Sequence, residues 1–112
     1  MLVKEMLNAD TNSDIDGPVV LFEMPDRIRG VIQVAVTELT GNSTMSAAIF
    51  EADGRLSENH GWFEVASNMN VGTTVGSLVT EDIVMFPQMR VRFNESGLNN
   101  TENAKVVAYI GN

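Results

Sequence analysis

The chain has no cysteine, and it has only one histidine, one tryptophan and one tyrosine among its 112 residues. Without cysteine no disulfide, thiolate metal site or thiol nucleophile can form, which excludes a small disulfide-stapled secreted domain. With His60 as the single histidine, a hydrolase triad has only one candidate for its base. We therefore expect a protein that binds or builds something and is not an enzyme.

Basic residues are also scarce, because 7 Lys and Arg stand against 15 Asp and Glu and give a net charge of −8. The electrostatic field of a chain with this net negative charge repels phosphate groups, so we expect neither nucleic-acid nor membrane partners. No apolar stretch approaches the ~20 residues of a membrane span, and the apolar run of residues 1–7 is short for a signal peptide. We expect a soluble chain that is not exported by the usual route.

Short apolar runs alternate with Gly, Pro, Asn and Asp after Gly17-Pro18, which is typical of strands joined by turns. With a turn signal every 8 to 12 residues, they predict an all-β fold, an antiparallel two-sheet sandwich or jelly roll of about 7–8 strands. Asp53-Gly54 is expected to end the third run. The expected strands are Val19–Met24, Val31–Leu39, Thr44–Ala52, Trp62–Ala66, Thr74–Thr80, Ile83–Phe86, Met89–Asn94 and Ala104–Ile110.

The first 17 residues differ from the rest, because Asn8 to Asp16 are almost all short polar residues that favour turns. We expect a flexible N-terminal arm over residues 1–17 and a sandwich domain over residues 18–112. Apolar side chains at the start of an arm are best explained by docking on a neighbour. The expected contact residues there are Leu2, Val3, Met6 and Leu7.

Four arginines form two pairs with i, i+2 spacing, Arg27 with Arg29 and Arg90 with Arg92. On exposed strand faces both pairs could line one contact surface. The alternative is that their aliphatic stems cover an exposed sheet face among carboxylates.

The chemical motifs are weak. The spacing of a calcium-binding loop is matched by Asn12, Asp14, Asp16, Gly17 and Glu23. The segment that should form the helix after such a loop, residues 20–25, begins with a β-branched residue and ends at a proline. The alternative to calcium binding is therefore an ordinary acidic turn. No other cofactor or metal is expected. Hydrolytic chemistry would fall to His60 beside Ser57 and Glu58, or to carboxylate pairs among Glu51, Asp53, Glu58 and Glu64.

Trp62 and Tyr109 are the aromatic residues best suited to stack on a sugar. In the strand pattern Trp62-Phe63-Glu64-Val65, however, we expect the tryptophan to fill the core. A carbohydrate-binding module thus stays open as an alternative, with an exposed Trp62 as its signature.

Four segments carry a family resemblance: Val31-Ile32-Gln33-Val34-Ala35-Val36, the small-residue run ending at Ala52-Asp53-Gly54 before Trp62, Pro87-Gln88-Met89-Arg90-Val91-Arg92-Phe93, and Val106-Val107-Ala108-Tyr109-Ile110. Over about residues 30–112 the chain resembles the small β-sandwich virion proteins of tailed bacteriophages, the head decoration or cement proteins and related tail accessory domains.

The resemblance implies a structural role with no catalytic residue. It implies a capsid decoration or stabilising protein, with a tail accessory protein as the alternative, located in the virion and assembled in the host cytoplasm. The implied partners are the major capsid protein or another virion protein and further copies of the chain, with a trimer favoured. In this family the terminal arm engages the shell or a neighbouring copy.

Overall fold

The computed structural model describes residues 2–23, 29–40, 45, 47–72, 75–98 and 103–112. Within these ranges the chain is all-β and contains no helix, and it therefore shows no helix long and apolar enough to cross a membrane. The strands are β1 (Val3–Thr11), β2 (Ile15–Asp16), β3 (Val20–Leu21), β4 (Arg29–Thr40), β5 (Ala47–Arg55), β6 (Phe63–Asn70), β7 (Leu78–Val84), β8 (Gln88–Ser96) and β9 (Asn103–Gly111).

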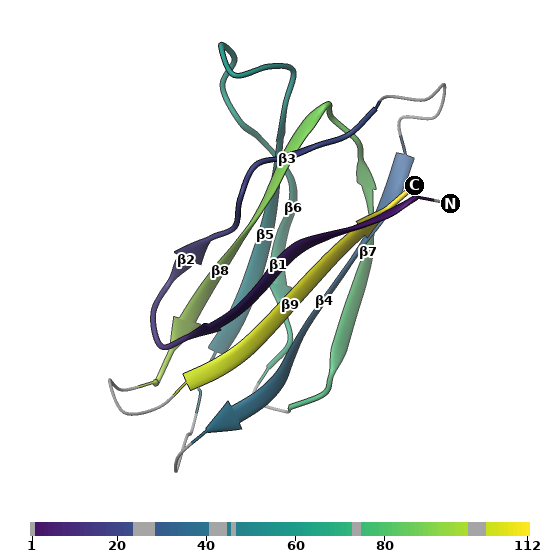
Figure 1. The fold of residues 1–112 in the computed structure, drawn as a ribbon. Coiled ribbons are helices and arrows are strands. Elements are labelled where there is room, and N and C mark those ends of the chain that lie inside the picture. The colour runs from purple at the N-terminus through teal and green to yellow at the C-terminus, as the bar shows by residue number, and fades with distance from the viewer. Residues whose placement is uncertain (1, 24–28, 41–44, 46, 73–74, 99–102) are drawn as a thin grey trace.

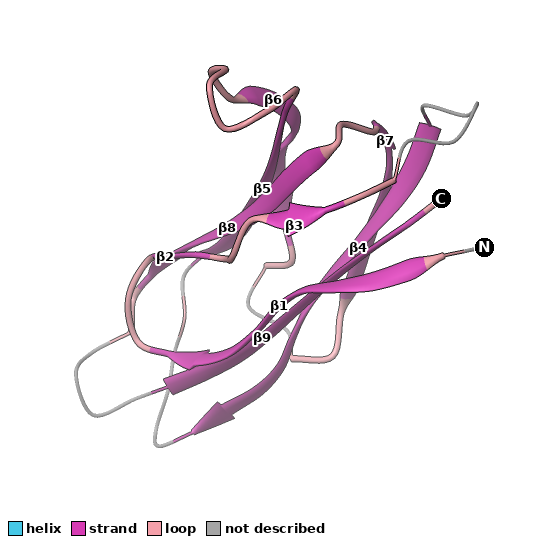
Figure 2. Ribbon diagram, turned by 45° about the horizontal axis from the view of Figure 1, so that its top comes forward, coloured by secondary structure: helices cyan, strands magenta, loops and turns pink. Residues whose placement is uncertain are grey.

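The strands form two antiparallel sheets packed face to face (Figure 1). One sheet has four strands in the order β1-β9-β4-β7. The other has five, β2-β8-β5-β6 with β3 also paired to β8, and Figure 2 shows the two layers separately. The expected antiparallel sandwich is confirmed.

Period-two alternation explains which side chains enter the space between the sheets. In β8, Met89, Val91 and Phe93 are fully buried, whereas Arg90 and Arg92 between them point to the outer face. In β5, Ala48 and Phe50 face the core, and Phe50 packs on Phe93 with ring centroids 5.1 Å apart. The same pattern in β4 and β9 buries Ile32, Val34, Val36, Ala104, Val106, Ala108 and Ile110.

The N-terminal segment is not a separate arm, and that expectation was wrong. Residues 3–11 form β1, which pairs with β9 from Val3 opposite Gly111 to Thr11 opposite Ala104. A β-bulge between Glu5 and Leu7 lets the adjacent residues Met6 and Leu7 both enter the core, where they are 1% and 5% exposed. The first strand is therefore an integral part of the four-stranded sheet.

Two other expected boundaries also differ. Asp53-Gly54 does not end a strand, because β5 continues to Arg55, and Gly54 pairs with Phe63 of β6 on one side and with Met89 of β8 on the other. The Phe86 ring covers Gly54, and a Cβ at this glycine would lie 2.4 Å from the ring. Residues 78–84 form one strand, β7, where the sequence suggested two short pieces.

Candidate functional site

The outer face of the five-stranded sheet carries an ion-pair network centred on Asp53 of β5. Arg90 donates to Asp53 Oδ2 through Nε at 2.9 Å, and Arg92 donates to the same oxygen through Nε at 2.7 Å. Arg92 also donates through Nη2 to Asp53 Oδ1, at 3.1 Å. Asp53 is only 3% exposed, and these charge-assisted hydrogen bonds compensate for its desolvation.

Two further carboxylates complete the network around Arg92. Its Nη2 lies 3.1 Å from Glu51 and 3.6 Å from Glu64, and Asn94 donates to the other oxygen of Glu51 at 2.9 Å. The hydrogen bond to Asp53, together with the negative charges of Asp53, Glu51 and Glu64, raises the pKa of the Arg92 guanidinium above its ordinary value. These side chains meet because β6, β5 and β8 are neighbours in register.

Trp62 lies against this network, between two arginines. The guanidinium carbons of Arg55 and Arg90 lie 4.3 Å and 4.4 Å from the centre of its ring, which is the geometry of two cation–π contacts. Arg55 is held in place by donating from Nε to Gln88 at 2.8 Å. Trp62 is half-buried rather than part of the core between the sheets, so the expectation that it fills the core was wrong.

The structure does not place Arg29 on the same surface as Arg90 and Arg92. Arg27 lies outside the described residues, and Arg29 is exposed at the start of β4 in the four-stranded sheet. Arg90 and Arg92 lie on the outer face of the other sheet and are held by carboxylates. Arg90 and Arg92 therefore match the alternative expectation, in which the aliphatic stems of the arginines cover a sheet face among carboxylates.

The loop between β5 and β6 holds the weak hydrolase candidate. Ser57 Oγ lies 2.7 Å from His60 Nδ1, but the same loop also closes on itself through a hydrogen bond from the His60 backbone N–H to the Ser57 carbonyl. His60 is exposed, and within the described residues its ring has no carboxylate partner to orient it. The contact thus has the geometry of a side chain closing a turn.

The calcium spacing does not fold into a loop of converging oxygens. Asp14 accepts a hydrogen bond from the Glu95 backbone N–H at 2.9 Å, and Asp16 pairs opposite Arg92 as an exposed residue of β2. In the part of the chain that the structure describes, no three acidic or histidine side chains are grouped to hold a metal ion.

The expected contact residues at the N-terminus divide into two pairs. Met6 and Leu7 are buried inside the chain's own core and are unavailable to a partner. Leu2 and Val3 are exposed, at 46% and 56%. Val3 belongs to a second candidate surface that sequence reasoning missed.

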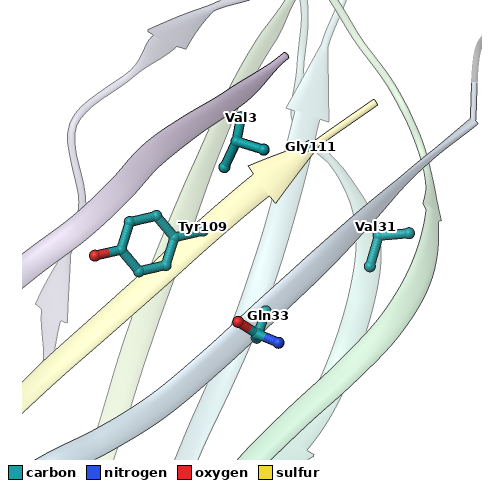
Figure 3. Close-up of a pocket in the computed structure, with 5 residues that line it drawn as sticks. All are labelled: Val3, Val31, Gln33, Tyr109 and Gly111. Carbon is teal, nitrogen blue, oxygen red and sulfur yellow. The ribbon is translucent and has the colours of Figure 1, made fainter. Parts of the chain in front are cut away.

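This second surface is the outer face of the four-stranded sheet, where an apolar hollow of about 230 Å³ lies over Gly111 (Figure 3). Val3 on β1 and Val31 on β4 flank Gly111 in one row across the sheet, and the glycine supplies no side chain between them. Gln33 and Tyr109 form the next row and close the hollow on one side.

Two further exposed apolar side chains lie on the same face, on the edge strand β7, in the rows beyond Asp82 and Thr80. Leu78 and Val84 of β7 are 62% and 48% exposed, and both alternate outward on the same face as Val31. Gln33 donates to the Thr80 hydroxyl at 3.5 Å, which links β4 to β7 at the centre of the face. The outer face of the four-stranded sheet therefore presents an apolar hollow and two further exposed apolar side chains, set among polar and charged residues of the same strands.

Neither a family model nor a curated protein nor a solved structure matches the chain.

Proposed function

We propose that the chain is a non-enzymatic structural protein that attaches to a larger protein assembly through the outer face of its four-stranded sheet. The observation that carries this proposal is the hollow over Gly111, flanked by Val3 and Val31, with Leu78 and Val84 exposed on the same face. Isolated exposed apolar residues are ordinary, but exposed apolar side chains grouped around a hollow, as Val3 and Val31 are, favour a contact with another protein.

The setting we propose for this assembly is the virion of a tailed phage, with the chain acting as a decoration or stabilising protein of the head. The proposal rests on the resemblance of residues 30–112 to that group, and the sandwich architecture agrees with it. A sandwich with an apolar hollow on one sheet face suits a protein that adds stability by burying surface on a shell.

The test is fractionation of lysate from the natural source on a density gradient, with detection of this chain by mass spectrometry. We expect the chain in fractions that contain assembled particles, far below the position of a free 12.2 kDa protein. Recovery only at the top of the gradient would contradict the structural role.

Light scattering on the purified protein tests the accompanying proposal of a homo-oligomer. A trimer requires a solution mass three times the 12.2 kDa of one chain. A mass of one chain at every concentration would contradict self-assembly but not attachment to other proteins.

A ligand-binding module is the second candidate, and the position of Trp62 favours it. The indole is half-buried beside Arg55 and Arg90 instead of filling the core, so a ligand that displaced an arginine would change its surroundings. Because Trp62 is the single tryptophan, its fluorescence reports on this site alone. Titration with soluble glycans should change the emission if this candidate is right and leave it unchanged if the structural role is right.

A further inference from the structure

The apolar hollow on the four-stranded sheet is bordered by carboxylates at opposite corners. In the row that contains Val3, Gly111 and Val31, the next position is Asp82 on β7. In the adjacent row Glu5 on β1 lies beside Tyr109. Both carboxylates are exposed, and neither has an ion-pair partner among the described residues.

The remaining charges of this face do not reverse its sign. Among the described residues that alternate outward, four are acidic and two are basic, which leaves the face with a net charge of −2. Lys105 is flanked by Asp10 and Glu38 in its own row, so its charge is already balanced locally. The acidic residues are Glu5, Asp10, Glu38 and Asp82, and the basic residues are Arg29 and Lys105.

We propose that this face docks a basic protein surface that places one apolar side chain in the hollow over Gly111, with Lys or Arg residues on either side facing Glu5 and Asp82. The inference rests on the proposed structural function and names the chemistry of the partner. A hollow of about 230 Å³ exceeds the ~150 Å³ cavities that take up a benzene-sized molecule, so it has room for one leucine or phenylalanine side chain.

Charge decides against a second copy of this chain as the occupant. The chain has a net charge of −8, and Arg90 and Arg92 are already engaged with carboxylates on the opposite face. Two such faces brought together would oppose like charges around a desolvated hollow, which is unfavourable. The negative charge of this face would attract a basic partner, which raises the rate of encounter and makes the two surfaces electrostatically complementary.

The test uses a synthetic peptide probe and the full chain labelled with ¹⁵N for NMR. The probe has the sequence Lys-Arg-Leu-Arg-Lys, and the controls replace its leucine by glycine or its four basic residues by glutamate. We expect the probe to shift the amide signals of residues around the hollow, with a Kd on the order of 1 mM. Removal of the leucine should weaken binding about tenfold or more, because the apolar burial is lost.

The matched variant is Gly111→Val, which fills the hollow. Gly111 is in a strand and is not among the glycines with positive φ, so valine suits its backbone. We expect Gly111→Val to abolish binding of the probe peptide. The control Leu56→Ser, on the exposed loop after β5, should bind the probe with wild-type affinity. Added salt should weaken binding of the probe to wild type several-fold.

Equal shifts with the glycine or glutamate peptide, or unchanged binding by Gly111→Val, would overturn the inference. The inference would also be overturned if light scattering showed that the wild-type protein is a dimer and that Gly111→Val is a monomer, since the hollow would then be occupied by a second copy of the chain. Gradient fractionation distinguishes a failure of this inference from a failure of the proposed function. A chain that sediments with particles but does not bind the probe would refute only the inference of a basic partner. A chain that binds the probe but is absent from particles refutes the structural role alone.

Discussion

Asp53 is the residue on which the outer face of the five-stranded sheet depends most. Two guanidinium groups converge on one of its oxygens, and the carboxylate itself is almost fully buried. Bringing these charges out of water is costly, so the intact network adds little net stability. Removing the central carboxylate, however, would leave two arginines next to each other with their shared partner gone.

Asp53→Ala should therefore lower the free energy of unfolding by about 2–3 kcal/mol, at the lower end for a broken buried pair because both arginines keep some access to solvent. Urea denaturation followed by Trp62 fluorescence measures the change. The matched control is Glu64→Gln, whose carboxylate is 46% exposed and 3.6 Å from Arg92, and we expect it to change stability by less than about 0.5 kcal/mol. Equal effects of the two variants would contradict the central place of Asp53.

Arg92 adds a prediction on pH. Its hydrogen bond to Asp53 raises the pKa of the guanidinium above its ordinary value, and a raised folded-state pKa contributes stability that is lost only as the pH rises through that value. The contribution is therefore intact from neutral to moderately alkaline pH. A lysine has an ordinary pKa of ~10.4, which applies to Arg92→Lys in the unfolded chain, whereas Asp53 holds the cation protonated to higher pH in the folded chain. We therefore expect the stability difference from wild type to be constant below about pH 10 and to grow between about pH 10 and pH 11.5. A constant difference over this range in urea titrations would contradict the argument.

Gly54 shows how closely one residue is packed in the same region. A Cβ there would lie 2.4 Å from Cδ1 and 2.7 Å from Cβ of Phe86, whose ring stacks on Phe63. We expect Gly54→Ala to cost about 1–3 kcal/mol by overpacking, and Gly61→Ala, with open space around it, to cost less than about 0.5 kcal/mol.

The double variant Gly54→Ala with Phe86→Leu checks the cause of this loss. Because the leucine vacates part of the space over Gly54, the two substitutions should cost less together than the sum of their separate effects, as measured by urea denaturation. Strict additivity would show that the loss at Gly54 does not come from contact with Phe86.

At the scale of elements, the strands that could be predicted from sequence are those with a long run of period-two alternation, which extends over most of β8 and all of β9 and in β4 lasts until the bulge after Val36. The expected ranges for β4, β8 and β9 fall within the observed strands, because each strand buries one face and exposes the other. β1 was missed since the bulge at Met6 breaks the alternation, and its outward residues Asn8 and Asp10 read as a polar linker. The inward residues Leu7, Ala9 and Thr11 were the available signal.

The candidate site could not be predicted for a different reason. The hollow exists because register places Val3, Gly111 and Val31 in one row, and these residues come from three distant parts of the chain. The position of Trp62 likewise depends on arginines from β5 and β8. Neither arrangement leaves a local pattern in the sequence.

The pairing of β1 with β9 gives a prediction on truncation of the chain. Deleting residues 1–11 removes Met6 and Leu7 from the core and the hydrogen-bond ladder from one side of β9. We expect the truncated chain to lack a cooperative unfolding transition and dispersed NMR signals, whereas Leu2→Ser, at a 46% exposed position, should fold as wild type does. A folded truncation product would mean that β1 is dispensable.

At the scale of the whole molecule, the two outer sheet faces have different characters. The five-stranded sheet satisfies its outward charges internally, through Asp53, Glu51 and the two arginines of β8. On the four-stranded sheet, apolar side chains face out together with Glu5 and Asp82, which have no ion-pair partner in the described part of the chain. This asymmetry is the basis for assigning attachment to the four-stranded sheet.

The most direct measurement of this claim is photo-crosslinking in assembled particles, with a benzophenone amino acid at the position of Val31 and, in a separate sample, at that of Leu56. We predict that the probe at Val31 forms crosslinks to a Lys- or Arg-rich segment of another particle protein, and that the probe at Leu56 gives far fewer. Crosslinks from Leu56 with none from Val31, or crosslinks from Val31 only to other copies of this chain, would contradict the account.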